Sequence, residues 1–221
     1  MLYSSAMTVI SETDLDEATA RYLTEKFLPS TLISIPQPIV YAMAGIPGAG
    51  KSEFTNGAIE RGEFPKNAFI LDPDRIMQAI PAYQDDLALS GKQTAYRRWE
   101  IPARLFAYAL SRMAMERRLN IIQDMGAVRR EDYDRLMVFK AAGYRLDMTY
   151  IYCPVDECLR RVSSRTTRHT AEEMIRERDQ SLRILLPEYV KIADNFRVFD
   201  NSDTEYPYRP TTLDEVMGKP L

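Results

Sequence analysis

An eight-residue segment combines the residue types that bind a phosphate. Residues 45–52 read GIPGAGKS and satisfy the pattern G-x-x-x-x-G-K-[ST], between an apolar run and a helical stretch. Glycines let backbone N–H groups converge on a phosphate, and the helix N-terminus adds positive potential. Lys51 is expected to reach the β- and γ-phosphates and the Ser52 hydroxyl to bind Mg²⁺; the alternative is a chance glycine turn that caps a helix. The predicted nucleotide-binding residues here are Gly45, Ile46, Pro47, Gly48, Ala49, Gly50, Lys51, Ser52 and Glu53.

Carboxylates follow two further strand candidates, residues 68–71 and 120–123. Asp72 and Asp74 come directly after the first of these, and we predict both in an acceptor site. Asp74 could take the proton of an acceptor hydroxyl, because ligands bind at the carboxyl ends of parallel strands; it could also cap the next helix. Asp124 ends the second strand candidate, where it could bind Mg²⁺, hold the acceptor or serve as a turn residue.

An arginine cluster lies in a polar connection late in the chain. Arg161, Arg165 and Arg168 alternate there with Ser and Thr. Such a segment can act as a lid, because guanidinium groups stabilise the charge that spreads over a phosphoryl group in transfer. An ordinary solvated surface is the alternative. Arg165 and Arg168 are the predicted catalytic lid residues.

Short apolar β-rich runs alternate with longer helical stretches along the chain. This rhythm predicts parallel strands joined by crossover helices. The expected fold class is therefore α/β, a three-layer α/β/α sandwich of the P-loop NTPase type with a mostly parallel five-stranded sheet. The strand candidates are residues 39–44, 68–71, 120–123, 145–152 and 197–199. The helix candidates are residues 14–27, 51–61, 102–119, 131–142 and 170–192.

Composition narrows the class of protein further. The 221 residues carry 29 basic and 32 acidic side chains, a net charge of −3, so no global basic field attracts nucleic acid. A hydrophobic fraction of 45% excludes a disordered chain. No apolar run reaches the roughly 18 residues that span a bilayer, and the N-terminus lacks the pattern of a secretory signal. Two Cys read as buried thiols of a reducing compartment, so we predict a cytoplasmic protein without a membrane partner.

The layout favours a kinase over other nucleotide-binding proteins. The N-K-x-D motif with which GTPases read their base is not in the sequence, and motor or AAA-type ATPases are normally larger. We predict an N-terminal helical extension over residues 1–36, a kinase domain over 37–205 and a tail over 206–221 that packs on the domain.

Together these segments resemble the zeta-toxin kinases of bacterial toxin–antitoxin systems and their chromosomal relatives. The resemblance runs from about Tyr41 to Asp203. It implies ATP- and Mg²⁺-dependent phosphorylation of a hydroxyl on a UDP-linked amino sugar, and an antitoxin protein as a partner. Besides the glycine loop, its landmarks are LDPD at 71–74, IPAY at 80–83, IIQD at 121–124, AGY at 142–144 and FRVFDNS at 196–202.

The resemblance also implies residue roles. Lys51 would hold phosphate, Asp74 would be the base and Asp124 the acidic residue that binds the acceptor. Arg165 and Arg168 would be the lid arginines. The segment that contains Asn201 resembles the one that packs near the adenine, which implies that Asn201 lies in the nucleotide site.

The chain departs from the family on the acceptor side. Where the family places a second acidic residue, in the helix before Asn120, this sequence has the stretch 106–109 without a carboxylate. The family's Thr and Arg contacts after the third strand are replaced by residues 126–128, although Arg129 or Arg130 could substitute. A missing partner for a buried polar group costs about 1–3 kcal/mol. The acceptor could therefore differ.

Two other functions fit parts of the pattern. A kinase of a polynucleotide 5′-hydroxyl, a nucleoside or a dinucleotide would share the loop, the aspartate and the arginines. The short basic pairs 97–98 and 117–118 give no stripe for a nucleic-acid strand to follow. A non-catalytic module that uses ATP as a switch would not need a base such as Asp74.

Overall fold

The computed structural model describes residues 15–164 and 170–218. It shows an α/β fold whose six strands form one mostly parallel sheet, in the order β2-β3-β1-β4-β5-β6. The described residues divide into two compact units. Unit 1 comprises residues 15–36 and 67–121, and unit 2 comprises residues 37–66, 122–164 and 170–218.

Three parallel strands form the centre of unit 2. β1 (Ile39–Ala44) pairs with β4 (Arg145–Tyr152), and β4 pairs with β5 (Asn195–Asp200). A sixth strand, β6 (Arg209–Thr211), pairs antiparallel with β5, so the expectation of five strands was one too few. β6 contains Pro210, which an edge strand tolerates because one side of its backbone needs no ladder hydrogen bonds.

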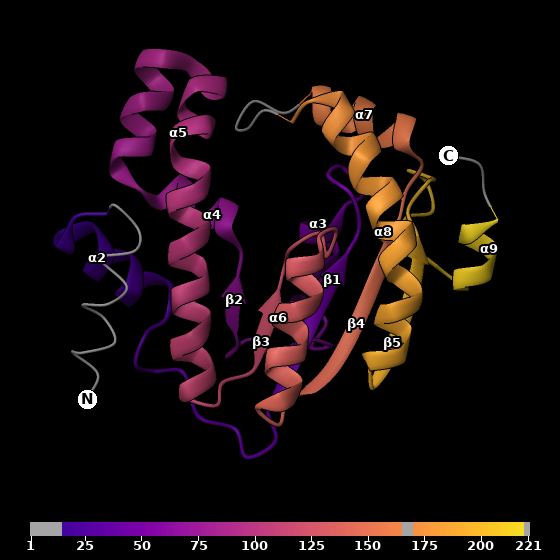
Figure 1. Ribbon diagram of the computed structural model, residues 1–221, viewed down its shortest axis with the longest axis horizontal. Helices are drawn as coiled ribbons and strands as arrows, with labels where there is room; N and C mark the ends of the chain where they lie inside the picture. Colours follow the sequence, from indigo (N-terminus) through magenta and orange to yellow (C-terminus); the bar gives the residue numbers. More distant parts are fainter. Residues whose placement is uncertain (1–14, 165–169, 219–221) are drawn as a thin grey trace. The chain divides into compact units, whose positions relative to one another are not determined.

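Helices lie on both faces of these strands in unit 2 (Figure 1). On one face, Phe54 packs its ring 4.9 Å from that of Phe199 on β5. Side chains alternate along a strand, and Tyr150 on β4 points to the opposite face, where burial and the nearby Asp179 raise its pKa. The sequence thus buries β4 on both faces, as its nearly continuous apolar run predicts. The helices of unit 2 are α3 (Lys51–Glu60), α6 (Arg130–Ala141), α7 (Val155–Ser163), α8 (Glu172–Ile192) and α9 (Leu213–Met217).

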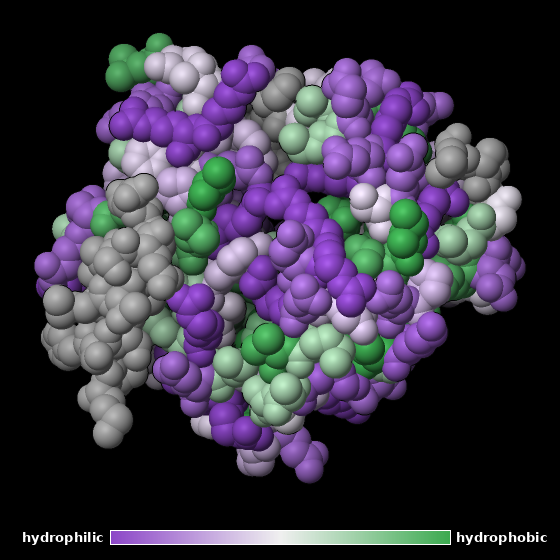
Figure 2. Space-filling view, viewed as in Figure 1, coloured by the Kyte–Doolittle hydropathy of each residue, from purple (hydrophilic) through white to green (hydrophobic). Residues whose placement is uncertain are grey.

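Hydrophilic side chains cover most of the outer surface over α6 and α8 (Figure 2). Large hydrophobic residues are exposed there only at scattered positions, Met137 and Val138 on α6 and Ile184 and Val190 on α8. No helix among residues 15–164 and 170–218 is long and apolar enough to cross a membrane.

Unit 1 is dominated by α5 (Pro81–Glu116), which consists of two helical parts separated by a kink at Gly91. It contains Pro102 and departs from helical backbone angles only at Gly91, where φ is +76°. The expected helix start at residue 102 was therefore wrong. Proline is typical of a first helical turn, but Pro102 lies inside the helical part that follows Gly91. The other elements of unit 1 are α2 (Glu17–Phe27), β2 (Phe69–Leu71) and α4 (Pro73–Ala79), and β3 (Ile121–Gln123) begins at its boundary.

The segment before residue 37 is held to the end of α5. The Arg117 guanidinium donates to the carbonyl oxygens of Leu28, Pro29 and Leu32 at 3.2, 3.0 and 3.0 Å. The Ile35 amide donates to the Arg118 carbonyl oxygen at 2.8 Å. Charged donors make the stronger protein hydrogen bonds, so this irregular segment is fixed within unit 1.

Candidate active site

The glycine loop between β1 and α3 has a backbone that only glycine adopts without strain. The φ angles are +147° at Gly45, +96° at Gly48 and +96° at Gly50. Space is restricted as well: a Cβ on Gly45 would lie 2.7 Å from the Ile151 carbonyl oxygen, and one on Gly48 would lie 2.6 Å from that of Cys158. Both the conformation and the close packing therefore require the glycines that the motif contains.

The N-terminus of α3 is arranged to receive an anion. Gly50 is the N-cap of this helix, and no side chain makes a capping hydrogen bond to it. The first N–H groups of a helix have no partner inside the helix, and the helix dipole favours a negative charge there. A nucleotide phosphate fits that position.

Lys51 and Ser52 open the same helix. The Lys51 ammonium donates to the carbonyl oxygens of Gly45 and Ile46 at 2.8 and 3.0 Å, so it lies along the loop. Phosphate oxygens would offer it charged acceptors, which make stronger hydrogen bonds than carbonyl groups. The Ser52 side chain is exposed at the second position of the helix.

Two side chains from the C-terminal part of unit 2 contact the loop. The Asn201 amide nitrogen donates to the Ala49 carbonyl oxygen at 2.8 Å, and the Tyr208 hydroxyl donates to the Gly50 carbonyl oxygen at 2.9 Å. The same hydroxyl lies 3.1 Å from Oε2 of Glu53. Sequence reasoning predicted Asn201 and Glu53 at the nucleotide site and missed Tyr208, because no motif marks a tyrosine so far from the loop.

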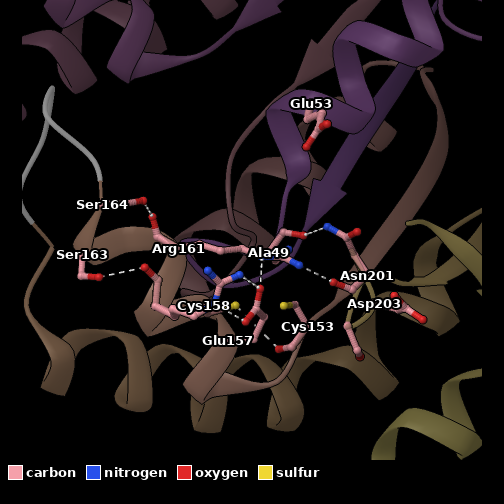
Figure 3. Close-up of polar contacts among 12 residues, drawn as sticks. Ala49, Glu53, Cys153, Glu157, Cys158, Arg161, Ser163, Ser164, Asn201 and Asp203 are labelled. Atoms are coloured by element: carbon pink, nitrogen blue, oxygen red, sulfur yellow. Dashed lines mark hydrogen bonds and ion pairs between the residues drawn. The ribbon is translucent and has the colours of Figure 1, made fainter. Parts of the chain in front are cut away.

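Arg161 holds the segment that carries Asn201 (Figure 3). Its guanidinium donates to the Asn201 carbonyl oxygen at 3.0 Å and to Oε1 of Glu157 at 2.6 Å. Hydrogen bonds from Arg160 and then from Arg161 lower the pKa of Glu157 to about 2. Arg161 thus has partners within unit 2, whereas the predicted lid residues Arg165 and Arg168 lie outside the described residues.

Two free thiols lie beneath the loop. Cys153 and Cys158 are both buried, as predicted, and their side chains lie next to each other in Figure 3. The Cys158 thiol donates to the Cys153 carbonyl oxygen at 3.7 Å. The contact with Cys153, followed by burial, raises the pKa of the Cys158 thiol. It therefore stays protonated and packs as a small apolar group.

The segment after β3 lies beside the glycine loop. The Gly45 amide donates to the Gly126 carbonyl oxygen at 3.0 Å, two residues beyond the half-buried Asp124. The oxygen atoms of Asp124 and Ser52 suit Mg²⁺, which prefers oxygen ligands. Among residues 15–164 and 170–218 no group of three or more His, Cys, Asp or Glu could hold a metal.

Arg129 was predicted to contact the acceptor. It occupies the N-cap position of α6 and is exposed, and its amide donates to Oδ2 of Asp132 at 3.1 Å. The sequence Gly126–Val128 precedes it with an unusual backbone, since Ala127 has a φ of +52°. Ala127 is fixed there by the Tyr189 hydroxyl, which donates to its carbonyl oxygen at 3.0 Å.

In unit 1 the two aspartates after β2 have different positions. Asp72 is buried and is the N-cap of α4, where its Oδ1 accepts from the amides of Asp74 and Arg75 at 3.0 and 3.1 Å. Asp74 is the second residue of the helix and is half-buried. The capping role considered for Asp74 therefore belongs to Asp72.

α5 carries the stretch in which the sequence lacks an expected carboxylate. Phe106 and Ala107 are completely buried, so this part of the helix packs in the core of unit 1. Before it, the Trp99 indole N–H donates to Oδ2 of Asp86 at 2.7 Å across the break at Gly91. The pair joins the two parts of α5, and nothing in the sequence pattern indicated it.

The family comparison covers most of the chain. The family model described as Zeta toxin matches residues 20–207, which include the glycine loop, both aspartates after β2 and Asp124. The chain belongs to the zeta toxin family. The resemblance drawn from the motifs is thereby confirmed. For this zeta toxin family member, the search of curated proteins found no match.

Two solved structures have a fold similar to that of this chain. One is from the PezAT chromosomal toxin-antitoxin system of Streptococcus pneumoniae, with 19% identity and a TM-score of 0.65 over 85% of this chain and 80% of that chain. The other is the AvrRxo1-ORF1:-ORF2 complex with ATP, with 12% identity and a TM-score of 0.60. The match covers 90% of this chain and 63% of that one, so this zeta toxin family member corresponds to under two thirds of the longer protein.

Proposed function

We propose that this protein is an ATP-dependent kinase that transfers the γ-phosphoryl group to an acceptor hydroxyl, with a UDP-linked amino sugar as the first candidate acceptor. The observation that carries the proposal is the glycine loop at the N-terminus of α3, with positive φ angles at Gly45, Gly48 and Gly50. Membership of the zeta toxin family supports kinase chemistry on this loop. The AvrRxo1 complex solved with ATP is consistent with ATP as the donor.

The proposed step is an in-line displacement. The acceptor oxygen forms a bond to the γ-phosphorus, the bond from that phosphorus to the bridging oxygen breaks, and ADP leaves. Asp74 takes the proton of the acceptor hydroxyl, Lys51 neutralises the phosphates, and Arg165 and Arg168 close over the transferring group. The roles of Asp74 and of the two arginines rest on the family motif. Asp72, Asp124 and Arg129 would contact the acceptor.

Magnesium would supply charge neutralisation at the β- and γ-phosphates. The Ser52 hydroxyl and the Asp124 carboxylate are the residues that would hold it. Asn201 and the loop residues from Gly45 to Glu53 complete the proposed nucleotide site.

We further propose an antitoxin protein as a partner and the cytoplasm as the place of action. The name of the PezAT system includes an antitoxin, and the AvrRxo1 structures are complexes of two chains. The buried, free thiols of Cys153 and Cys158 fit a reducing compartment.

A different acceptor is the second candidate. The observation that favours it is Ala107, which is buried in the stretch where the family places an acidic residue. A polynucleotide 5′-hydroxyl, a nucleoside or a dinucleotide would need other contacts than a UDP-linked sugar.

Mass spectrometry of an acceptor panel tests the proposal. The protein is incubated with ATP, Mg²⁺ and UDP-sugars, nucleosides, NAD or oligonucleotides, with Lys51→Ala as the matched control. We expect a Lys51-dependent mass gain of one phosphoryl group on a UDP-linked amino sugar. A gain only on another compound would keep the kinase and replace its acceptor. ATP hydrolysis at the same slow rate with every compound would indicate a switch module and contradict the proposal.

A further inference from the structure

Two carbonyl groups of the glycine loop are held from outside the loop. Asn201 donates to the carbonyl oxygen of Ala49 at 2.8 Å, and Tyr208 donates to that of Gly50 at 2.9 Å. A Cβ on Gly50 would lie 2.4 Å from the Asn201 amide nitrogen and 2.9 Å from the Tyr208 hydroxyl. The two side chains therefore occupy the space directly beside Gly50.

The two side chains also contact each other. The Asn201 side-chain amide is near enough to the Tyr208 hydroxyl to act on its pKa, which it lowers slightly. The Tyr208 hydroxyl donates its hydrogen bond to the Gly50 carbonyl oxygen or to Glu53, whose Oε2 lies 3.1 Å away. Burial, followed by the Glu53 carboxylate, raises the pKa of Tyr208, so the hydroxyl keeps its proton at neutral pH.

Each of the two residues is itself fixed. Asn201 is 3% exposed. Its backbone N–H donates to the Tyr152 carbonyl oxygen at 2.8 Å, and its backbone carbonyl oxygen accepts from Arg161 at 3.0 Å. The Tyr208 ring packs edge-on against Phe54 at 5.4 Å. Tyr208 has a φ of +57°. This left-handed conformation is energetically unfavourable for a residue with a large side chain. Such a conformation persists where the surrounding contacts enforce it.

The geometry of the peptide bond links these contacts to phosphate binding. No peptide bond in the described part of the chain is cis. In a trans peptide the C=O and the next N–H point in opposite directions. When the carbonyls of Ala49 and Gly50 point to Asn201 and Tyr208, the N–H groups of Gly50 and Lys51 point to the other side. These N–H groups belong to the part of the motif that is predicted to cradle a phosphate.

We propose that Asn201 and Tyr208 are positioning residues of the nucleotide site, which act through the loop by fixing the orientation of the Ala49–Gly50 and Gly50–Lys51 peptide planes. This inference rests on the proposed function and goes beyond it, since none of the motifs quoted in the sequence analysis includes Tyr208. Asn201 has the larger effect. The Gly50 oxygen also accepts from the Phe54 amide at 3.0 Å, the first hydrogen bond of α3, whereas Asn201 holds Ala49 without that help.

The test compares Tyr208→Phe with Tyr206→Phe in the full chain. Tyr206 is 72% exposed on the same segment, which makes it a matched control. ADP affinity is measured by calorimetry and adenosine affinity by ligand-observed NMR. We expect Tyr208→Phe to weaken ADP binding about 3–10-fold, the effect of one hydrogen bond, and Asn201→Ala to weaken it more. Adenosine affinity and melting temperature should be the same in Tyr208→Phe as in the wild-type protein. Tyr206→Phe should match the wild-type protein in all three measurements.

Each outcome has a separate meaning. Wild-type ADP affinity in a folded Tyr208→Phe variant overturns the inference for Tyr208, and equal losses for ADP and adenosine overturn its link to the phosphate. If Tyr208→Phe melts at a lower temperature, the ADP-to-adenosine ratio at a temperature where it is folded decides, because a purely structural defect does not change that ratio. Absence of ADP binding in the wild-type protein contradicts the proposed function itself.

Discussion

In the proposed reaction, the two units of this zeta toxin family member would recognise their ligands with different parts of the polypeptide. In unit 2 the glycine loop presents backbone groups, and side chains such as Asn201 and Tyr208 contact the loop from outside. In unit 1 the residues proposed to contact the acceptor, Asp72 and Asp74, would act with their own carboxylates. A backbone-based site depends on a few glycines and changes little, whereas a site made of side chains can change its ligand with each substitution.

The chain departs from the family motifs in the side chains of the proposed acceptor site and not in the glycine loop. The loop contains every residue of its motif, while the buried stretch around Ala107 lacks the expected carboxylate. ATP as the donor is therefore a stronger proposal than any named acceptor. Substitutions in each unit test this difference between the two sites.

Gly48→Ala should have the largest effect, because it changes the backbone-based site. The new Cβ would meet the Cys158 backbone at 2.6 Å, at a φ of +96°. Backbone atoms cannot move aside as a side chain can, so we expect ADP affinity to fall by about 30-fold or more, on the order of 2 kcal/mol. Calorimetric titration with ADP measures this.

Gly143→Ala is the matched control for that substitution. Gly143 has a φ of +82°, and a Cβ there would meet nothing within 4 Å. It should lose about 1–2 kcal/mol of folding free energy from the strained φ alone and retain ADP affinity. Equal losses of ADP affinity in the two variants would show that contact with Cys158 does not shape the loop.

Asp72 tests the side-chain-based unit, and its effect should be intermediate. Asp72→Ala removes the N-cap of α4, in which Oδ1 accepts from the Asp74 and Arg75 amides at 3.0 and 3.1 Å. The expected loss is about 1–2 kcal/mol in the free energy of unfolding, measured by urea denaturation. ADP affinity should stay at the wild-type value.

Asp72→Asn separates capping from acceptor binding. Asn caps a helix as well as Asp does, so stability should return while the negative charge is lost. A loss of phosphoryl transfer in this stable variant would support the predicted contact between Asp72 and the acceptor. Full transfer activity would assign Asp72 to the cap alone.

The same physical difference explains what the sequence could predict. β1 and β4 have the predicted bounds 39–44 and 145–152, because strands covered on both faces need continuous apolar runs. The glycine loop was predictable since its φ angles admit few other residues. These features are determined by residues that are adjacent in the sequence.

Features that depend on distant contacts were not predictable. β6 contains Pro210 and forms only because β5 offers it a partner strand. The first part of α5, before Gly91, is joined to the rest by the hydrogen bond from the Trp99 indole N–H to Asp86. Tyr208 lies more than a hundred residues from Gly50 along the chain, so only the folded structure shows their contact.

The smallest predicted effect concerns a side chain that supports the backbone-based site indirectly. Glu157 binds Arg160 and Arg161, and Arg161 in turn holds Asn201. These bonds lower the pKa of Glu157 to about 2, against an ordinary value of 4.5. A carboxyl with a lowered pKa stabilises the folded state above its ordinary pKa and loses that contribution as the pH falls toward the folded value.

The stability of the wild-type protein should therefore decrease between pH 4.5 and pH 2 more than that of Glu157→Gln. Because Glu157 is near the surface, the difference should stay below about 1 kcal/mol. Urea denaturation at a series of pH values measures it, with the exposed Glu173→Gln on α8 as the control. Identical pH profiles for wild type and Glu157→Gln would show that the Glu157–Arg161 pair adds nothing to the support of Asn201. Tyr208 and Asn201 would then hold the loop without it.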